Sequence, residues 1–109
     1  MTKYAGIDRD AVVSLLSRFI EIPSINPAFR TENDGEASHF GEQALAEALH
    51  EWFMAANVDC SIDEVTPGRP NLIARVKGRS GAKRMLWEGH LDTVQVSGMA
   101  TPFVPRIEG

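Results

Sequence analysis

The chain has 109 residues, a formal net charge of −4 and one cysteine, which is enough for one modest domain. The acidic balance without a basic patch excludes a nucleic-acid-binding surface, and no apolar run in the sequence is long enough for a membrane span. Cys60 has no partner for an intramolecular disulfide and fits a reducing compartment, and the N-terminal residues resemble no secretory signal, so we expect a soluble, cytoplasmic protein.

The first periodic segment predicts a helix over residues 8–22. Asp8 is a suitable N-cap, and Pro23 disfavours helical geometry at the residue before it, so the helix should end there. The apolar residues at helical spacing are Val12, Leu15, Leu16, Phe19 and Ile20. Residues 23–35 are rich in proline, asparagine and glycine and predict a loop. The residues alone fit either a functional loop or a plain connector between two helices.

The next segment predicts a longer helix, over residues 36–56. Its expected buried face consists of Phe40, Ala44, Leu45, Ala48, Leu49 and Trp52. His39 and His50 fall on the polar face about three turns apart, which separates them by about 16 Å along the axis. Because this distance is too long for two ligands of one metal ion, we interpret both as solvated surface histidines.

The pattern then changes to period two and predicts strands. Residues 58–63 alternate between apolar and polar, residues 66–70 have the chemistry of a turn, and residues 72–77 alternate again. The turn over residues 78–81 lacks the arrangement of a phosphate-binding loop and leads to a third, apolar strand over residues 84–88. Two helices and three strands predict the α/β class, with the helices packed on a mixed β-sheet.

The segment Gly89–Val94 follows the third predicted strand and holds His90 and Asp92. Side chains alternate faces along an extended chain, so these two should project to the same side at the carboxyl end of the strand, where functional residues collect in open α/β sheets. A neutral imidazole binds Zn²⁺ through one ring nitrogen, and a carboxylate can accept a hydrogen bond from the other. Taken alone, the pair fits both a metal site and an ordinary surface contact.

In its surroundings this segment resembles the metallopeptidase family M20, which includes acetylornithine deacetylase, succinyl-diaminopimelate desuccinylase and glutamate carboxypeptidase. Three further segments agree with the family pattern in order along the chain: 23–27 (Pro-Ser-Ile-Asn-Pro), 71–76 (Asn-Leu-Ile-Ala-Arg-Val) and 102–105 (Pro-Phe-Val-Pro). The resemblance covers most of the chain and implies the N-terminal part of a zinc-peptidase-like catalytic domain.

The resemblance implies roles for two residues. His90 matches a zinc-ligand histidine, and Asp92 matches the catalytic aspartate that orients ligands at the site. A complete site of this family holds two Zn²⁺ ions, with Co²⁺ as an alternative metal. The resemblance also places Ser24 and Asn26 beside the metal site as supporting residues. It assigns no substrate-binding residue within this chain.

The resemblance further implies that residues 1–109 are the N-terminal portion of an M20-type catalytic domain, truncated before the segment that carries the family's metal-bridging aspartate. The full-length protein would be a homodimeric amidohydrolase that hydrolyses amide bonds of N-acyl amino acids or small peptides, and the chain alone would be inactive. The alternative belongs to a different class. It is a non-catalytic, truncated or degenerate α/β module that binds a partner protein through a sheet edge or an apolar face.

Overall fold

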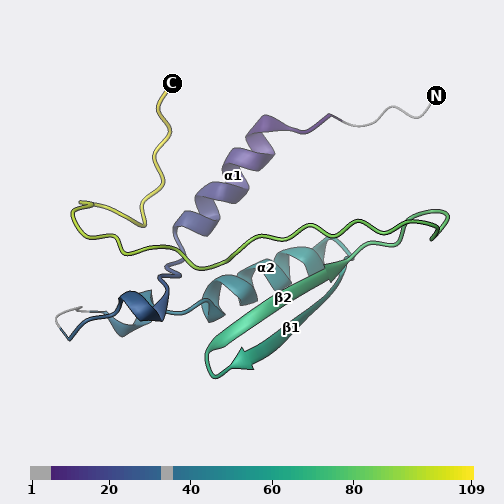
Figure 1. The fold of residues 1–109 in the computed structure, drawn as a ribbon. Helices are drawn as coiled ribbons and strands as arrows, with labels where there is room; N and C mark the ends of the chain where they lie inside the picture. Colours follow the sequence, from purple (N-terminus) through teal and green to yellow (C-terminus); the bar gives the residue numbers. More distant parts are fainter. Residues whose placement is uncertain (1–5, 33–35) are drawn as a thin grey trace. The chain divides into compact units, whose positions relative to one another are not determined.

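The computed structural model describes residues 6–32 and 36–109. These residues contain two α-helices, α1 (Arg9–Ile20) and α2 (Gln43–Ala55), and two strands, β1 (Asp59–Thr66) and β2 (Arg69–Arg75) (Figure 1). They also contain two short 3₁₀ helices, η1 (Pro27–Phe29) and η2 (Ala37–His39). The chain has two compact units: Pro23–Gln95 forms one, and residues 6–22 with Val96–Gly109 form the other. The combination of helices with a sheet confirms the α/β class. None of the helices in the described residues has the length and apolar character needed to cross a membrane.

Helix α1 begins where the sequence predicts. The carboxylate of Asp8 accepts hydrogen bonds from the backbone N–H groups of Asp10 (2.9 Å) and Ala11 (3.3 Å). These donors have no partner within the helix, so the side chain of the N-cap satisfies them. The predicted cap is therefore confirmed, and the helix ends shortly before Pro23, as expected.

Helix α2 is shorter than predicted, because it begins at Gln43 rather than at the start of the predicted segment. Gly41 has a φ of 95°, a left-handed conformation that glycine adopts readily and that interrupts a right-handed helix. Residues 37–39 form the separate helix η2. His39 is therefore not on α2, and its predicted position on one helix face with His50 is wrong.

The strands β1 and β2 form an antiparallel hairpin. In its register Cys60 lies opposite Ala74 and Ile62 lies opposite Leu72, so both predicted strands are confirmed. Burial does not alternate along β2 as the sequence predicts, because Leu72 and Ile73 are both half-buried and Ala74 is exposed. The turn between the strands contains Gly68 with a φ of 73°. Helix α2 packs against both strands of the hairpin (Figure 1). This helix-on-hairpin layer is the framework on which the candidate site is built.

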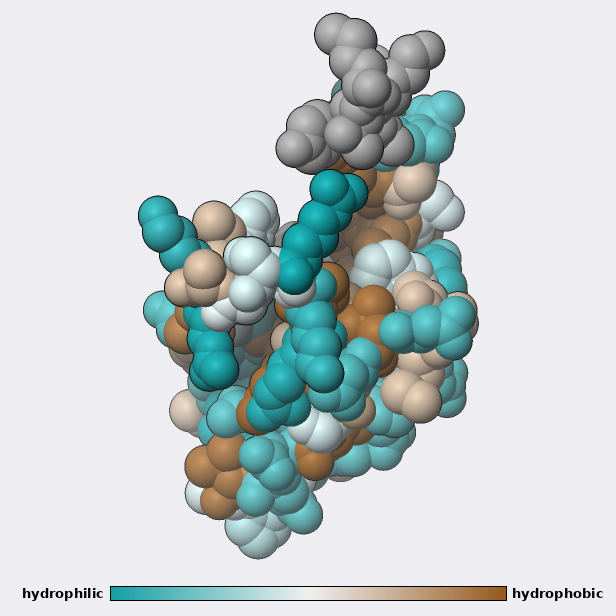
Figure 2. Space-filling model, turned by 90° about the vertical axis from the view of Figure 1, so that its right-hand side faces the viewer, coloured by the Kyte–Doolittle hydropathy of each residue, from teal (hydrophilic) through white to brown (hydrophobic). Residues whose placement is uncertain are grey.

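The hydrophobic core of the described residues is small. Its buried hydrophobic side chains are Ile25, Leu45, Ala46 and Cys60. The predicted buried face of α2 is only partly right. Leu45 is buried, but Ala44 is exposed, Trp52 keeps 38% of its surface exposed, and Ala46, which is outside that predicted face, is fully buried. Hydrophobic side chains also reach the surface between hydrophilic ones, as Figure 2 shows for one face of the molecule. The chain therefore buries less apolar surface than its pattern of apolar residues would allow.

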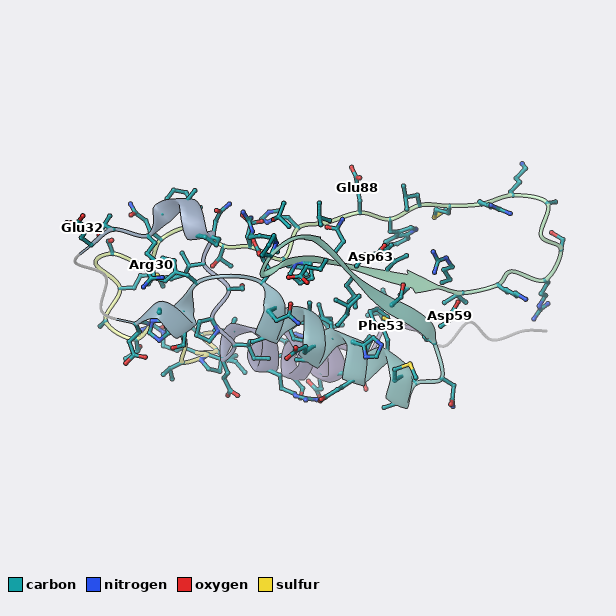
Figure 3. The ribbon with its side chains drawn as sticks, turned by 90° about the horizontal axis from the view of Figure 1, so that it is seen from below. Arg30, Glu32, Phe53, Asp59, Asp63 and Glu88 are labelled. Atoms are coloured by element: carbon teal, nitrogen blue, oxygen red, sulfur yellow. The ribbon has the colours of Figure 1, made fainter. Side chains whose placement is uncertain are left out.

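The third predicted strand is absent from the part of the chain that the structure describes. Residues 84–88 have no strand partner, and the side chains of Met85, Leu86 and Trp87 are 78%, 86% and 85% exposed. A strand needs a neighbour for its backbone N–H and C=O groups, and β1 and β2 pair with each other. The described sheet is therefore antiparallel and two-stranded, whereas the sequence predicts a mixed sheet. Figure 3 shows Glu88 on this segment, with its side chain pointing away from the hairpin.

Candidate functional site

The loop that contains Ile25 is anchored to the segment before α2. The Ile25 N–H donates to the carbonyl of His39 (3.0 Å), and the Ile25 carbonyl accepts from the N–H of Gly41 (2.9 Å). The side chain of Ile25 belongs to the core, with 3% of the residue exposed. The predicted loop is thus held by both its backbone and its side chain, and it lies in a fixed position beside the start of α2.

The same loop also holds the segment that carries Asp92. The Thr93 N–H donates to the carbonyl of Ser24 (2.9 Å), and the Asn26 N–H donates to the carbonyl of Thr93 (2.9 Å). The hydroxyl of Ser24, a residue with 3% exposure, donates to the carbonyl of Leu91 (2.9 Å). A buried hydroxyl needs such a partner. These three bonds fix the backbone on both sides of Asp92.

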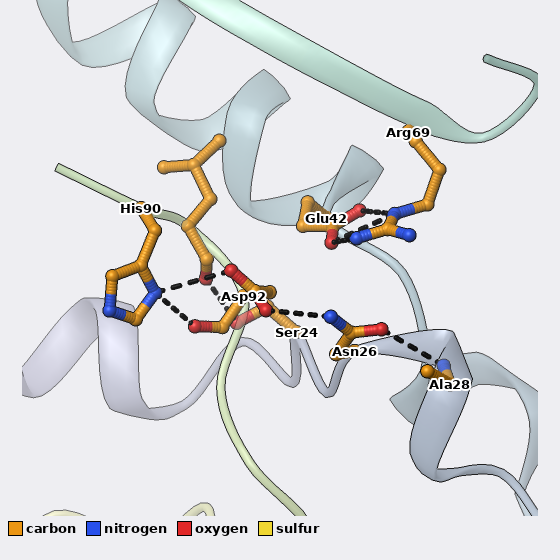
Figure 4. Close-up of polar contacts among 8 residues, drawn as sticks. Ser24, Asn26, Ala28, Glu42, Arg69, His90 and Asp92 are labelled. Carbon is orange, nitrogen blue, oxygen red and sulfur yellow. Dashed lines mark hydrogen bonds and ion pairs between the residues drawn. The ribbon is translucent and has the colours of Figure 1, made fainter. Parts of the chain in front are cut away.

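His90 and Asp92 are in contact, as their spacing predicts, although no strand precedes them in the described structure. The Nδ1 atom of His90 lies 2.7 Å from the backbone oxygen of Asp92 and 3.2 Å from its Oδ1 (Figure 4). Neither oxygen can donate a hydrogen bond, so Nδ1 must carry the proton of the neutral ring, and the lone pair is on Nε2. The imidazole is 84% exposed. Its Nε2 atom is therefore accessible.

The carboxylate of Asp92 has a second partner. The amide Nδ2 of Asn26 donates to Oδ2 of Asp92 at 2.9 Å. This hydrogen bond lowers the pKa of Asp92, and the neighbouring His90 lowers it further, against an opposing effect of desolvation. Asp92 is therefore a carboxylate at neutral pH, with one oxygen toward the imidazole and the other toward the amide (Figure 4).

An ion pair between a buried carboxylate and an exposed guanidinium, which the sequence reasoning missed, lies close to this group. Glu42, at the start of α2, is 5% exposed. Arg69 of the hairpin donates to it from Nε (2.8 and 3.0 Å) and from a terminal nitrogen (2.7 Å). These hydrogen bonds raise the pKa of Arg69, and the charges of Glu42 and Asp92 add to the effect. No local pattern signals the pair, because its members are 27 residues apart.

A cleft of about 710 Å³ lies between β2 and residues 86–92. Its lining includes His90, Asp92 and the Glu42–Arg69 ion pair. The volume is in the range of small-molecule sites. The cleft therefore brings an accessible imidazole nitrogen and an ionised carboxylate to one concave surface.

The donor set of this cleft fits one ligand position of a zinc centre. Zinc takes a neutral imidazole nitrogen, and the ligand's other nitrogen ordinarily donates to a carboxylate or a carbonyl, as Nδ1 of His90 does here. Within residues 6–32 and 36–109, no three His, Cys, Asp or Glu side chains are grouped closely enough to hold a metal ion. A catalytic zinc site needs three protein ligands, so these residues supply only part of one.

The positions expected of Ser24 and Asn26 are confirmed, since both donate hydrogen bonds to the segment that follows His90. Their expected function as supports of a metal site stays a prediction. The metal-binding role of His90 and the catalytic role of Asp92 also stay predictions.

A stretch of 54 residues is 46% identical to acetylornithine deacetylase of Vibrio vulnificus (strain CMCP6). The match covers 50% of this chain and 14% of the relative, so the aligned part is a small fraction of that protein's length. No family model matches the chain, and no solved structure matches it. The partial match indicates an M20-like relationship, and with it a relationship to hydrolases.

Proposed function

We propose that this chain contributes the His90–Asp92 part of the active site of an M20-type zinc amidohydrolase. The observation that carries the proposal is the arrangement of the imidazole. Its Nδ1–H is held by two oxygens of Asp92, at 2.7 and 3.2 Å, and its Nε2 opens to solvent. A ligand oriented in this way binds zinc more tightly than an unrestrained surface histidine.

In this proposal His90 binds one of two Zn²⁺ ions through Nε2, with Co²⁺ as an alternative metal. Asp92 orients the imidazole and remains charged. Zinc, when bound, supplies Lewis acidity toward an amide carbonyl and toward water. In this proposal the other ligands come from outside the described residues, because those residues bring no three His, Cys, Asp or Glu side chains together closely enough to hold a metal ion.

The proposed reaction is hydrolysis of the amide bond of an N-acyl amino acid or a small peptide. The support for this substrate class is the 54-residue match to a protein named as an acetylornithine deacetylase, together with a cleft of suitable volume beside His90. We propose that the active protein is a cytoplasmic homodimer and that residues 1–109 form the N-terminal portion of its catalytic domain. By themselves they should be inactive.

Zinc titration followed by NMR of the histidine side chains tests the proposal. In the 109-residue chain, Zn²⁺ should shift the ring resonances of His90 at lower concentration than those of His50. The Asp92→Asn variant should bind zinc at His90 about 10 to 100 times more weakly, because the carboxylate that orients the ligand is lost. The matched control is Asp63→Asn, a change on the exposed part of β1 that should leave the titration unaltered. The proposal would be contradicted if the unaltered chain and Asp92→Asn bound zinc at His90 with equal affinity.

A second experiment tests the expected incompleteness of the site. The 109-residue chain loaded with Zn²⁺ or Co²⁺ should not hydrolyse N-acetylornithine, because a single histidine leaves most of the metal's coordination positions to water. Turnover that depends on the metal and is lost in His90→Ala would show that the described residues form a more complete site than the structure indicates.

The exposed side chains of Met85, Leu86 and Trp87 favour a second candidate, an interaction module without catalytic activity. The same zinc titration separates the two candidates. An interaction module has no need of an oriented imidazole, so His90 would then bind zinc with the affinity of any exposed histidine, and Asp92→Asn would change nothing.

A further inference from the structure

We infer that Asn26 is a positioning residue for the candidate metal site: its amide orients the Asp92 carboxylate, which together with the backbone oxygen of Asp92 holds the proton of His90 on Nδ1 and leaves Nε2 to a metal. The functional meaning of this inference rests on the proposed zinc-binding role of His90. The series of hydrogen bonds from Ala28 through Asn26 and Asp92 to His90 does not rest on that role, because these bonds join atoms of the protein itself.

The amide of Asn26 has a fixed orientation. Its Oδ1 accepts a hydrogen bond from the backbone N–H of Ala28 at 2.9 Å. An N–H group can only donate, so the amide oxygen must face Ala28 and the NH₂ group must face the other way. The side chain cannot be flipped without placing its NH₂ against the Ala28 N–H. The short helix η1 thus determines the direction in which Asn26 donates.

The NH₂ group of Asn26 meets Oδ2 of Asp92 at 2.9 Å. The other oxygen, Oδ1, lies 3.2 Å from Nδ1 of His90. The carboxylate is held between an amide and an imidazole, one at each oxygen. Because a carboxylate only accepts hydrogen bonds, this arrangement requires the proton of the neutral imidazole to be on Nδ1.

The backbone contacts of this region leave a specific task to the side chain of Asn26. Hydrogen bonds from Ser24 and Thr93 already hold the chain on both sides of Asp92. They do not restrain rotation of its carboxylate. The hydrogen bond from Nδ2 of Asn26 does restrain the rotation of the carboxylate. Loss of this hydrogen bond should leave the backbone in place and free the carboxylate to turn away from His90. The backbone oxygen of Asp92, 2.7 Å from Nδ1, would remain as a partner of the ring.

The variant Asn26→Ser separates the two functions of this residue. A serine hydroxyl can still accept from the Ala28 N–H, because serine is as good an N-cap as asparagine. It is too short to reach Asp92. The backbone N–H that donates to Thr93 is also retained. Asp63→Ser, which also introduces serine but at an exposed position of β1 that does not line the cleft, is the control.

The first measurement is the ¹⁵N spectrum of the imidazoles in the metal-free chain, at a pH above the usual titration range of histidine. We expect His90 to be mainly the Nδ1–H tautomer in the unaltered chain and in Asp63→Ser. In Asn26→Ser the population of the Nδ1–H tautomer should fall in the same direction as in Asp92→Ala, and the backbone oxygen at residue 92, 2.7 Å from Nδ1, should retain part of that population in both variants. In the double variant Asn26→Ser/Asp92→Ala, the loss of Asn26 should add nothing, because its effect passes through the carboxylate.

An unchanged tautomer population in Asn26→Ser would overturn the inference. The inference would also be overturned if Asn26→Ser shifted the tautomer population of His90 by the same amount in the Asp92→Ala background, because Asn26 would then act through the fold and not through the carboxylate. If Asn26→Ser fails to fold, Asn26→Asp provides the test, because it retains the acceptor for Ala28 and replaces the donor with a second carboxylate. That variant should shift the tautomer in the same direction, and an unchanged ring would again refute the idea.

Zinc affinity is the second measurement and tests the functional meaning. The affinity at His90 should fall in Asn26→Ser, by up to the 10- to 100-fold loss typical of a group that orients a ligand, and should not fall in Asp63→Ser. A tautomer shift without any change in zinc affinity would leave the positioning role intact and would count against the proposed metal site. The two readouts therefore distinguish failure of the inference from failure of the proposed function.

Discussion

The variant Gly41→Ala tests the turn that separates η2 from α2. Gly41 has a φ of 95°, and its N–H donates to the carbonyl of Ile25 at 2.9 Å. A methyl group added there would meet the carbonyl oxygen of Gly68 at 3.7 Å, an ordinary van der Waals distance. Steric conflict with neighbours is therefore not the issue. The cost of the substitution comes from the backbone conformation.

An L-residue in a left-handed conformation costs about 1–2 kcal/mol. Replacing glycine by alanine also reduces the entropy of the unfolded chain, which by itself stabilises the folded state by about 0.4–1 kcal/mol. The control Gly78→Ala has the second effect without the first, because Gly78 has no left-handed φ and a methyl group added there would meet no heavy atom within 4 Å. The difference between the two variants should thus equal the strain, about 1–2 kcal/mol.

Urea unfolding followed by tryptophan fluorescence measures this difference, and thermal unfolding gives an independent value. For a domain of this size, 1 kcal/mol corresponds to a change of about 4–8 °C in the unfolding midpoint. Gly41→Ala should therefore unfold at a clearly lower temperature than Gly78→Ala. Equal midpoints would refute the reasoning, because they would mean that residue 41 adopts an ordinary conformation in solution and that α2 starts earlier.

Three further predictions concern the core, the unpaired segment and the candidate site. Leu45→Ala truncates a side chain at a residue that is 8% exposed and should lower the free energy of unfolding by about 2–5 kcal/mol. The control Leu16→Ala, at a position that is 57% exposed, should change the free energy of unfolding by less than about 0.5 kcal/mol. Urea titrations measure both values. With Trp52→Phe, the remaining Trp87, 85% exposed, should emit like free tryptophan and be quenched readily by acrylamide, whereas protection would indicate that its segment is paired. The lowered pKa of Asp92 should appear as a ¹³C carboxyl titration below the usual range of aspartate in the metal-free chain. Its stabilising contribution should be complete above the unfolded-state pKa and disappear as the pH falls through the lowered one, so an ordinary titration would contradict the contact with the amide.

Local sequence patterns predicted the local structure well. The cap at Asp8, the end of α1 before Pro23 and the presence of the strands β1 and β2 depend on neighbouring residues, and each is confirmed. The prediction of a third strand failed because an apolar pattern indicates which side chains a strand would bury, whereas the backbone pairing of a strand depends on a partner strand elsewhere in the chain. The break before α2 could have been found, since Gly41 interrupts an otherwise helical pattern.

In the candidate site, too, a contact between near neighbours could be predicted from the sequence pattern and contacts between distant residues could not. The contact between His90 and Asp92 follows from a spacing of two residues and could be predicted. The hydrogen bond from Asn26 joins residues 66 positions apart, and only the family resemblance suggested that the two segments meet. Nothing in the sequence pattern indicated that Glu42 would be buried, because a single glutamate at the start of a helix is ordinarily solvated.

The ion pair between Glu42 and Arg69 also has a consequence for strand alignment. A slip of one residue in a hairpin turns every side chain of the moving strand to the opposite face. If β2 slipped in this way, Arg69 would leave Glu42, and a buried carboxylate would lose all three of its hydrogen bonds. A buried charge without a partner is strongly unfavourable. The ion pair therefore favours the observed register of the hairpin, in which Arg69 reaches Glu42.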